Sequence, residues 1–253
     1  MTAWVLDLDG VLWLGDEPIA GAAEAASQLV DDGVDVALVS NNSYPTIGDY
    51  RAKLASHGVP ERADLITSAM AAASLVRAGE RVLVCAGPGV VEAIEGRGAE
   101  AVPADVDPGP VDAVIVGFHR EFDYERLRRA ATAVRGGARL LATNDDATYP
   151  TPDGPIPGGG AILAAIERAA GASATIAGKP YEPICALVRS RHGVDGIVVG
   201  DRPDTDGRFA RALGWRFALV LSGVTTDPAG ADPAPDLVAP DLASLVANLR
   251  RGE

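Results

Sequence analysis

Short apolar runs that end in polar residues recur along the chain, and they predict the first elements of the fold. Residues 3–6 form a run typical of a buried strand, and residues 20–32 have the pattern of a helix that ends at Gly33. Residues 35–39 indicate a second strand ending at Ser40, and a helix is expected from about Thr46. This alternation is typical of a doubly wound parallel sheet.

The same texture continues through the middle of the chain. It predicts strands at 81–86, 112–117 and 139–142 and helices near 88–95, 123–135 and 161–170. A loop rich in Thr, Asp, Pro and Gly covers residues 143–160. We therefore expect a second, smaller α/β unit with a core of its own.

The last third returns to the pattern of the first. It predicts a helix at 181–192, a strand at 196–200, a helix at 205–213, a strand at 216–221, an edge strand at 236–239 and a helix at 241–250. The expected fold is thus α/β: a doubly wound, Rossmann-like parallel-sheet core made of residues 1–76 and 180–253, with an α/β cap inserted at 77–179.

Composition narrows the function classes. The 253 residues are 47% hydrophobic, enough for a sizeable core, and the net charge of −13 would repel a nucleic acid. We expect no membrane segment, because no apolar run approaches the roughly 18 residues of a membrane helix. We expect no secretory signal, because the N-terminus has no basic region and no cleavable apolar stretch, and hence a cytoplasmic protein. Cys85 and Cys185 are expected to be reduced thiols packed in the interior.

Four polar segments each lie close to an apolar run. Since the carboxyl ends of parallel strands line one crevice, we expect their side chains to converge. The segments are Asp7-Leu8-Asp9-Gly10-Val11, Ser40-Asn41-Asn42-Ser43, Gly178-Lys179-Pro180, and Gly200-Asp201 through Thr205-Asp206.

These residue types indicate phosphoryl transfer to an aspartate. Asp7 and Asp9 can address one site provided that the chain stays extended to Asp9, and Mg²⁺ is a natural partner for carboxylates placed after an apolar strand. A phosphate dianion and three aspartates together carry about five negative charges, whereas Mg²⁺ and one lysine supply about three positive charges. Amide and hydroxyl donors, together with a proton on Asp9 as general acid, would offset the difference.

The chain resembles the haloacid dehalogenase superfamily, in its NagD/p-nitrophenylphosphatase-type branch with a large α/β cap. The resemblance spans essentially the whole chain. It rests on DLDGVLW at 7–13, SNNS at 40–43, the cap-loop segments at 143–145 and 157–160, GKP at 178–180, GDRPDTD at 200–206 and SGVTT at 222–226.

The resemblance implies a role for each motif residue. Asp7 would attack phosphorus, and Asp9 would protonate the leaving group and later activate water. The Asp7 side chain, the Asp9 carbonyl oxygen and the Asp201 carboxylate would hold Mg²⁺. Ser40, Asn41 and Asn42 would hold the phosphoryl oxygens. Lys179 would bridge Asp7 and the phosphate, and Asp206 would support the metal or the lysine from behind.

In this branch the resemblance assigns substrate choice to the cap. Asn144, Asp146 and Tyr149 are the expected contacts to the non-phosphate part of a small phosphorylated metabolite, and a homodimer through the cap is a further implication. The chain departs from the family pattern at Pro203 and Gly207, where bulkier apolar residues are usual. Neither change removes a catalytic group.

The resulting expectation is a Mg²⁺-dependent phosphatase that acts on small phosphomonoesters. One alternative is a metal-independent haloacid dehalogenase, against which Asp9 and Asp201 count. The other is a catalytically silent protein that binds phosphorylated metabolites.

Overall fold

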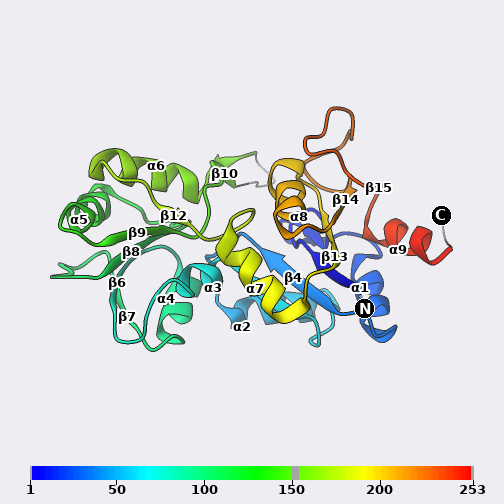
Figure 1. Ribbon diagram of the computed structural model, residues 1–253, viewed down its shortest axis with the longest axis horizontal. Coiled ribbons are helices and arrows are strands. Elements are labelled where there is room, and N and C mark those ends of the chain that lie inside the picture. Colours follow the sequence, from blue (N-terminus) through cyan, green and yellow to red (C-terminus); the bar gives the residue numbers. More distant parts are fainter. Residues whose placement is uncertain (1, 150–153, 252–253) are drawn as a thin grey trace. The chain divides into compact units, whose positions relative to one another are not determined.

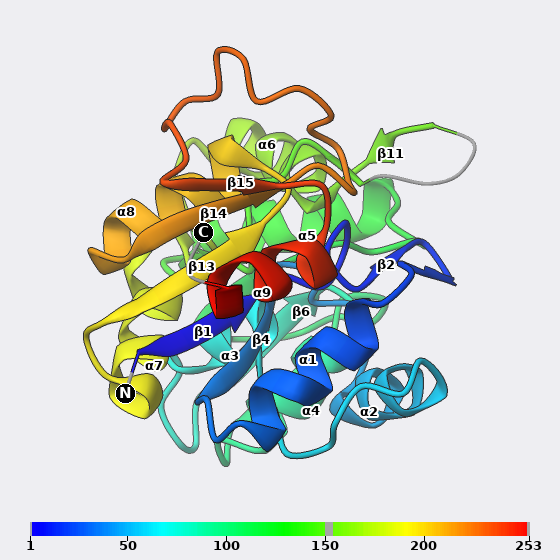
Figure 2. The same cartoon turned by 90° about the vertical axis from the view of Figure 1, so that its right-hand side faces the viewer.

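The computed structural model describes residues 2–149 and 154–251, and the chain forms two compact units. The core unit contains residues 1–40, 49–66 and 179–253, and the inserted unit contains residues 41–48 and 67–178. Both units are α/β (Figures 1 and 2). The fold class is therefore the one that the sequence predicts.

A six-stranded sheet in the order β15-β14-β13-β1-β4-β5 forms the centre of the core unit. Its elements are β1 (Ala3–Leu6), β2 (Trp13–Leu14), β3 (Glu17–Pro18), α1 (Ala22–Asp31), β4 (Val36–Ser40), α2 (Ile47–Ser56), β5 (Asp64–Thr67), α7 (Glu182–His192), β13 (Gly196–Gly200), the π-helical turn η1 (Pro203–Gly207), α8 (Arg208–Leu213), β14 (Arg216–Val220), β15 (Leu237–Ala239) and α9 (Leu242–Arg251). Helices α1 and α9 pack together on one face of this sheet, and α7 and α8 pack together on the other (Figure 2).

Strand β1 lies at the point where the strand order reverses. It pairs in parallel with β4 on one side and with β13 on the other. The chain passes from β1 to β4 and β5, and later returns to β13, β14 and β15 on the opposite side. Open α/β sheets bind ligands at such a switch point, outside the carboxyl ends of the strands.

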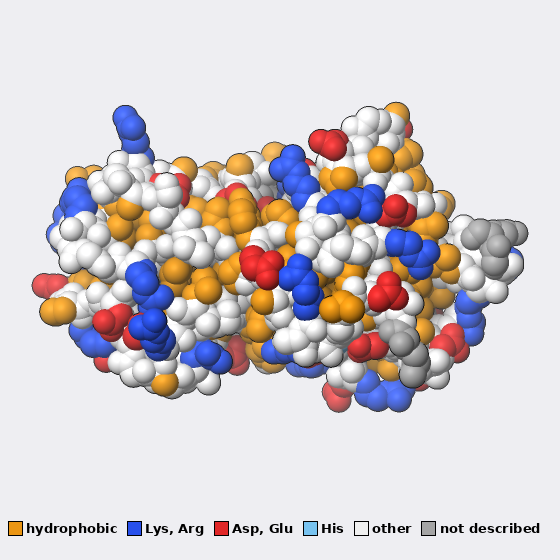
Figure 3. Space-filling model, viewed as in Figure 1, with side chains coloured by type: hydrophobic (Ala, Val, Ile, Leu, Met, Phe, Trp, Pro, Cys, Tyr) orange, Lys and Arg blue, Asp and Glu red, His pale blue; other side chains and the backbone are white. Residues whose placement is uncertain are grey.

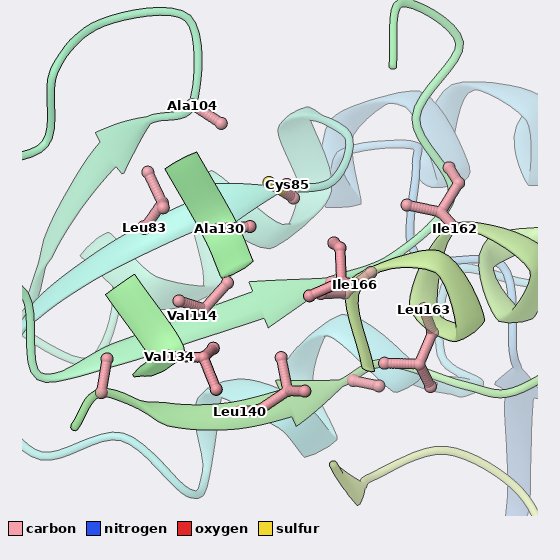
Figure 4. Close-up of a cluster of buried hydrophobic side chains, with 13 residues drawn as sticks. Leu83, Cys85, Ala104, Val114, Ala130, Val134, Leu140, Ile162, Leu163 and Ile166 are labelled. Carbon is pink, nitrogen blue, oxygen red and sulfur yellow. The ribbon is translucent and has the colours of Figure 1, made fainter. Parts of the chain in front are cut away.

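The inserted unit has a separate sheet in the order β12-β9-β8-β6-β7, with parallel pairing throughout. Its elements are α3 (Ser68–Ala73), β6 (Arg81–Cys85), α4 (Pro88–Glu95), β7 (Glu100–Pro103), β8 (Ala113–Val116), α5 (Tyr124–Arg135), β9 (Arg139–Ala142), β10 (Thr148–Tyr149), β11 (Ile156–Pro157), α6 (Gly159–Ala170) and β12 (Thr175–Ile176). Figure 4 shows its apolar core, in which Leu83 and Val114 of the sheet lie with Ala130 of α5 and Ile166 of α6.

The bounds of the inserted unit differ from the expected 77–179 in three places. Residues 67–76 belong to the inserted unit because α3 packs against α4. Residues 41–48 also belong to it, since a Cβ atom on Gly89 would lie 2.8 Å from the carbonyl oxygen of Ser43. Lys179 falls in the core unit and not in the insertion.

Most of the predicted elements are present within one or two residues of their expected ends, and Gly33 has the left-handed φ of 78° expected after a helix. The prediction missed helix α3 and the short strands β2, β3, β5, β7, β10, β11 and β12. Strand β7 lies at the sheet edge and has a single fully buried side chain, Val102, so its apolar pattern is weak. The helix expected at 205–213 begins only at Arg208, because residues 203–207 form the π-helical turn η1.

A histidine links three elements of the core unit. His192, the last residue of α7, places Nδ1 3.0 Å from the Asp35 carboxylate and Nε2 3.1 Å from the Asp64 carboxylate. The hydrogen bond to Asp64 and the one to Asp35 raise the pKa of His192 despite its burial. This pair of contacts ties the carboxyl end of α7 to the start of β4 and of β5.

On the face of the molecule in Figure 3, basic and acidic side chains are interspersed. Within residues 2–149 and 154–251, no helix has the length and apolarity needed to span a membrane. Cys85 and Cys185 are free and buried, and burial raises the pKa of their thiols to about 12 and about 11.

Candidate active site

Asp7 directly follows β1, and its backbone N–H extends the ladder by donating to Val199 of β13 at 2.9 Å. This pairing fixes the Asp7 side chain at the switch point of the sheet. Burial raises the pKa of the Asp7 carboxyl well above its usual range, and the charges of Asp206 and Asp201 add to that effect. The positive charge of Lys179 acts in the opposite direction.

Lys179 is a buried cation between two carboxylates. Its Nζ atom donates to Asp7 Oδ1 at 2.8 Å and to Asp206 Oδ1 at 2.6 Å, and its side chain is 2% exposed. Burial alone would lower the pKa of Lys179, yet the two neighbouring aspartates raise it above its ordinary value. The lysine therefore carries its charge at any physiological pH.

Asp201 and Asp206 follow β13 and complete an acidic group with Asp7. One carboxylate oxygen from each of the three residues lies within 4.8 Å of the others. The Asp201 Oδ2 atom accepts a hydrogen bond from the Val224 N–H at 2.6 Å, while Asp206 accepts from the Arg202 N–H at 3.2 Å. Burial and the charge of Asp206 raise the pKa of Asp201 to about 7.

Glycines make room for these carboxylates. Gly10 has φ +82°, and a Cβ atom there would overlap the Asp201 carboxylate. A Cβ on Gly223 would also overlap Asp201, and one on Gly200 would overlap Asp206. The carboxylates thus pack directly against backbone, which fixes their positions.

The three carboxylates fit a divalent cation. Carboxylate oxygens are the hard ligands that Mg²⁺ prefers, and three negative charges exceed the single charge of Lys179. A cation among these oxygens would favour their ionised forms, against the effect of burial. Asp7, Asp201 and Asp206 are therefore the residues of this group that could hold one.

Asp9 lies two residues beyond Asp7, where the chain has left the extended path. The carbonyl oxygen of Leu8 accepts from the Leu12 N–H at 2.9 Å, so residues 8–12 form a tight turn. The Asp9 Oδ1 atom accepts from the indole N–H of Trp13 at 3.1 Å. Burial raises the pKa of Asp9, while the charge of Lys53 and the Trp13 hydrogen bond act to lower it.

Ser40 is the last residue of β4, the strand paired with β1. Its side chain is buried, and its hydroxyl accepts a hydrogen bond from the Tyr50 hydroxyl at 3.1 Å. The chain crosses from the core unit into the inserted unit immediately after it. Ser40 is thus the member of the SNNS motif that belongs to the core unit.

Asn41 and the cap-loop residues meet within the inserted unit. The Asn41 carbonyl oxygen accepts from Asn144 Nδ2 at 2.7 Å and from Ser68 Oγ at 2.6 Å, and its own Nδ2 donates to Asp146 Oδ2 at 3.0 Å. Two of the residues expected to touch substrate, Asn144 and Asp146, therefore bind Asn41. Tyr149 stacks on Phe118, with ring centroids 5.5 Å apart.

Asn42 follows Asn41 in the chain, and its Oδ1 atom accepts from the Tyr44 N–H at 3.1 Å. The predicted residues thus form two groups. The core unit holds Asp7, Asp9, Ser40, Lys179, Asp201 and Asp206, and the inserted unit holds Asn41, Asn42, Asn144, Asp146 and Tyr149.

Sequence reasoning assigned no role to two residues that contact this site. Trp13 donates to Asp9, and its position four residues after the acid was a signal that could have been used. Val224 donates its backbone N–H to Asp201 across 23 residues, and nothing in a backbone donor's residue type could have identified it.

Comparisons with known proteins show the family of the chain. A family model described as haloacid dehalogenase-like hydrolase matches residues 4–100, and a second, HAD-hydrolase-like, matches residues 176–245. The chain is 33% identical to D-glycerol 3-phosphate phosphatase of Mycobacterium tuberculosis, over 95% of this chain and 70% of that protein.

Two solved structures are similar along almost the whole chain. Glycerol phosphate phosphatase from M. tuberculosis in complex with magnesium has a TM-score of 0.86 at 32% identity, covering 96% of this chain and 75% of that one. The 4-nitrophenylphosphatase from Thermotoga maritima has a TM-score of 0.87 at 30% identity, covering 98% and 97%.

Proposed function

Because this chain belongs to the haloacid dehalogenase-like hydrolases, in their NagD/p-nitrophenylphosphatase-type branch, we propose that it hydrolyses small phosphomonoesters through an aspartyl phosphate on Asp7. The chain is a phosphomonoester hydrolase with Mg²⁺ as its cofactor, in keeping with its phosphatase relatives and the magnesium complex. The observation that carries the proposal is Lys179, buried between Asp7 and Asp206 with the Asp201 carboxylate beside them.

The first step transfers the phosphoryl group to the enzyme. An oxygen of the Asp7 carboxylate attacks phosphorus as the bond from phosphorus to the ester oxygen breaks. The electron pair of that bond stays on the leaving oxygen, which takes the proton of the Asp9 carboxyl. The products are an alcohol, an aspartyl phosphate and an ionised Asp9.

The second step returns the enzyme to its starting form. Asp9, now a carboxylate, takes a proton from a water molecule as the water oxygen attacks phosphorus. The bond between phosphorus and the Asp7 oxygen breaks, which releases inorganic phosphate and restores the Asp7 carboxylate. One acid therefore serves both half-reactions, and its raised pKa suits the protonated form that the first step needs.

Charge neutralisation falls to Lys179 and the metal. Mg²⁺ held by the site residues would supply positive charge to the phosphoryl oxygens. We assign its binding to the Asp7 and Asp201 carboxylates with the Asp9 carbonyl oxygen. Asp206, which accepts from Lys179 at 2.6 Å, holds the lysine in place.

We assign the phosphoryl oxygens to Ser40, the last residue of β4, and to Asn41 and Asn42 directly after it in the chain. The hydrogen bonds of Asn144 and Asp146 with Asn41 support a role for this loop in positioning Asn41, besides any contact with substrate. Tyr149 offers an aromatic surface for the non-phosphate part.

The substrate class we propose is small alcohol and sugar monophosphates. Support comes from the relative that is a D-glycerol 3-phosphate phosphatase. The loop residues named above are neutral or acidic, so they offer no positive charge to a di- or triphosphate.

The test is a panel of phosphorylated metabolites, assayed for phosphate release with Mg²⁺ and with EDTA. We expect Mg²⁺-dependent release from the wild type, and none from Asp7→Asn, which keeps the size of the side chain but lacks the nucleophile. Phosphate release by Asp7→Asn would refute the nucleophile assignment. Halide release from haloacids that EDTA does not affect would favour the dehalogenase instead.

A further inference from the structure

The indole of Trp13 contacts the residue proposed as general acid. Trp13 is 2% exposed, and its Nε1–H group donates to Asp9 Oδ1 at 3.1 Å. The two residues also form an isolated backbone bridge, and the Gly10 N–H donates to the Trp13 carbonyl oxygen at 2.7 Å. The turn between them is therefore closed by backbone and side-chain bonds together.

Lys53 of α2 and His57, the first residue after that helix, contact the indole ring. The Lys53 ammonium lies 4.6 Å from the ring centroid of Trp13, in cation–π geometry. The same ammonium donates to the Gly15 carbonyl oxygen at 2.5 Å and to the Asp16 carboxylate at 3.3 Å. The His57 ring lies against the indole with centroids 5.6 Å apart.

An indole is a suitable partner for an acid that cycles between two protonation states. Its N–H group donates and cannot accept a hydrogen bond. It can therefore bond to a carboxyl oxygen whether Asp9 is ionised or protonated, provided that the proton resides on the other oxygen. A hydrogen bond from Trp13 to Oδ1 favours Oδ2 as the oxygen that carries the transferable proton.

We propose that Trp13, supported by Lys53, is a positioning residue that fixes the orientation of the Asp9 carboxyl and directs its proton to Oδ2. This inference rests on the proposed function, in which Asp9 protonates the leaving oxygen. In the transfer the Oδ2 proton moves to the leaving oxygen as the phosphorus–oxygen bond breaks. Trp13 keeps its bond to Oδ1 throughout.

The inference predicts an effect that depends on the leaving group. An alkoxide leaving from an alkyl phosphate needs the proton, whereas p-nitrophenolate leaves readily as an anion. Trp13→Phe keeps an aromatic ring against Lys53 and His57 and removes the N–H donor. The measured quantity is kcat/KM, because it reports the steps up to phosphorylation of Asp7 and excludes hydrolysis of the aspartyl phosphate.

We expect Trp13→Phe to lower kcat/KM for glycerol phosphate about ten-fold or more, a part of the 10²–10⁴-fold that general acids contribute. For p-nitrophenyl phosphate the change should stay below about two-fold. An equal loss on both substrates, or no loss on either, would overturn the inference, since a structural role predicts no such split. Circular dichroism and the urea midpoint establish that the variant is folded.

Lys53→Met serves as a second variant, since it leaves the indole in place and removes its support, together with the positive charge that lowers the pKa of Asp9. We expect the same split between the two substrates at a smaller size, so it tests the inference even where Trp13→Phe does not fold. Equal behaviour on both substrates would contradict the supporting role of Lys53.

Asp9→Asn separates this inference from the proposed function. If Asp9→Asn retains wild-type kcat/KM for glycerol phosphate, the general acid of the proposed function is wrong. If Asp9→Asn loses that activity while Trp13→Phe treats both substrates alike, the inference about Trp13 fails alone. A readout independent of turnover is the ¹⁵N–¹H signal of the Trp13 indole, which should shift in Asp9→Asn and should not shift in Glu125→Gln, whose exposed carboxylate pairs with Arg128.

Discussion

Replacing Lys179 by methionine removes the one buried cation that is paired with Asp7 and Asp206 among the residues described here. The methionine side chain is nearly as long and apolar, so the substitution deletes charge with little change in volume. The two carboxylates left behind have side chains that are 13% and 1% exposed. They would then lie together without the countercharge that the lysine provides.

The magnitude follows from the two lost contacts. A hydrogen bond between charged groups contributes about 1.5–3 kcal/mol, and removing one partner of a buried ion pair typically costs about 3–5 kcal/mol. We therefore expect Lys179→Met to lower the free energy of unfolding of the core unit by about 4 kcal/mol. That is a large part of the roughly 5–15 kcal/mol by which folded proteins are stable.

The assay is urea unfolding at pH 8 without divalent cations, followed by tryptophan fluorescence. Trp4, Trp13 and Trp215 all belong to the core unit, so their emission reports on the unit that contains Lys179. Arg62→Met is the matched control, because Arg62 and Asp31 form an ion pair with side chains 71% and 70% exposed. We expect it to cost no more than about 1 kcal/mol.

Proton binding and Mg²⁺ binding should both reduce the loss of unfolding free energy that Lys179→Met causes. A carboxyl whose pKa is raised on folding opposes folding above that pKa and ceases to oppose it once protonated. The charge of Lys179 lowers the pKa of Asp7 and of Asp201, so without it both carboxyls take up protons at a higher pH than in the wild type, and the difference in unfolding free energy between variant and wild type should narrow from pH 8 to pH 5. Mg²⁺ should also narrow the difference in unfolding free energy between the variant and the wild type. A variant within about 1 kcal/mol of wild type at pH 8 without metal would refute this reasoning.

Two further predictions concern other parts of the core unit. The pKa of His192 is raised in the folded state, so the contribution of its protonated form to stability is complete below the pKa of the unfolded chain. That contribution is lost as the pH rises through the pKa of the folded state. Asp64, whose pKa is lowered, stays ionised over this range. The unfolding free energies of wild type and His192→Gln should therefore differ more at pH 6 than at pH 9, and a constant difference would contradict this. Gly223→Ala should weaken Mg²⁺ binding about ten- to hundred-fold by calorimetry, since its Cβ would overlap Asp201. Gly33→Ala, whose Cβ would meet nothing within 4 Å, should bind Mg²⁺ like the wild type, and equal affinity of both variants would refute the argument.

Local pattern predicts most of the core sheet. The apolar runs of β1, β4 and β13 are buried along their whole lengths, so each is recognisable without knowledge of its neighbours. Weakly patterned strands such as β7 were missed, because only one of its four side chains is fully buried. The bounds of the inserted unit were also displaced, since α3 joins that unit through packing against α4 and not through any feature of its own sequence.

Taken alone, the sequence determined that Asp7, Ser40 and Asp201 lie near the carboxyl ends of β1, β4 and β13. The reason is that strand order in an α/β sheet places these ends at one edge. Only the tertiary structure decided which atoms pair: Lys179 with Asp206, Asp9 with Trp13, and Asn41 with the loop 144–146. Such bonds depend on side-chain directions set by packing between segments that can lie more than a hundred residues apart, and local pattern carries no record of those directions.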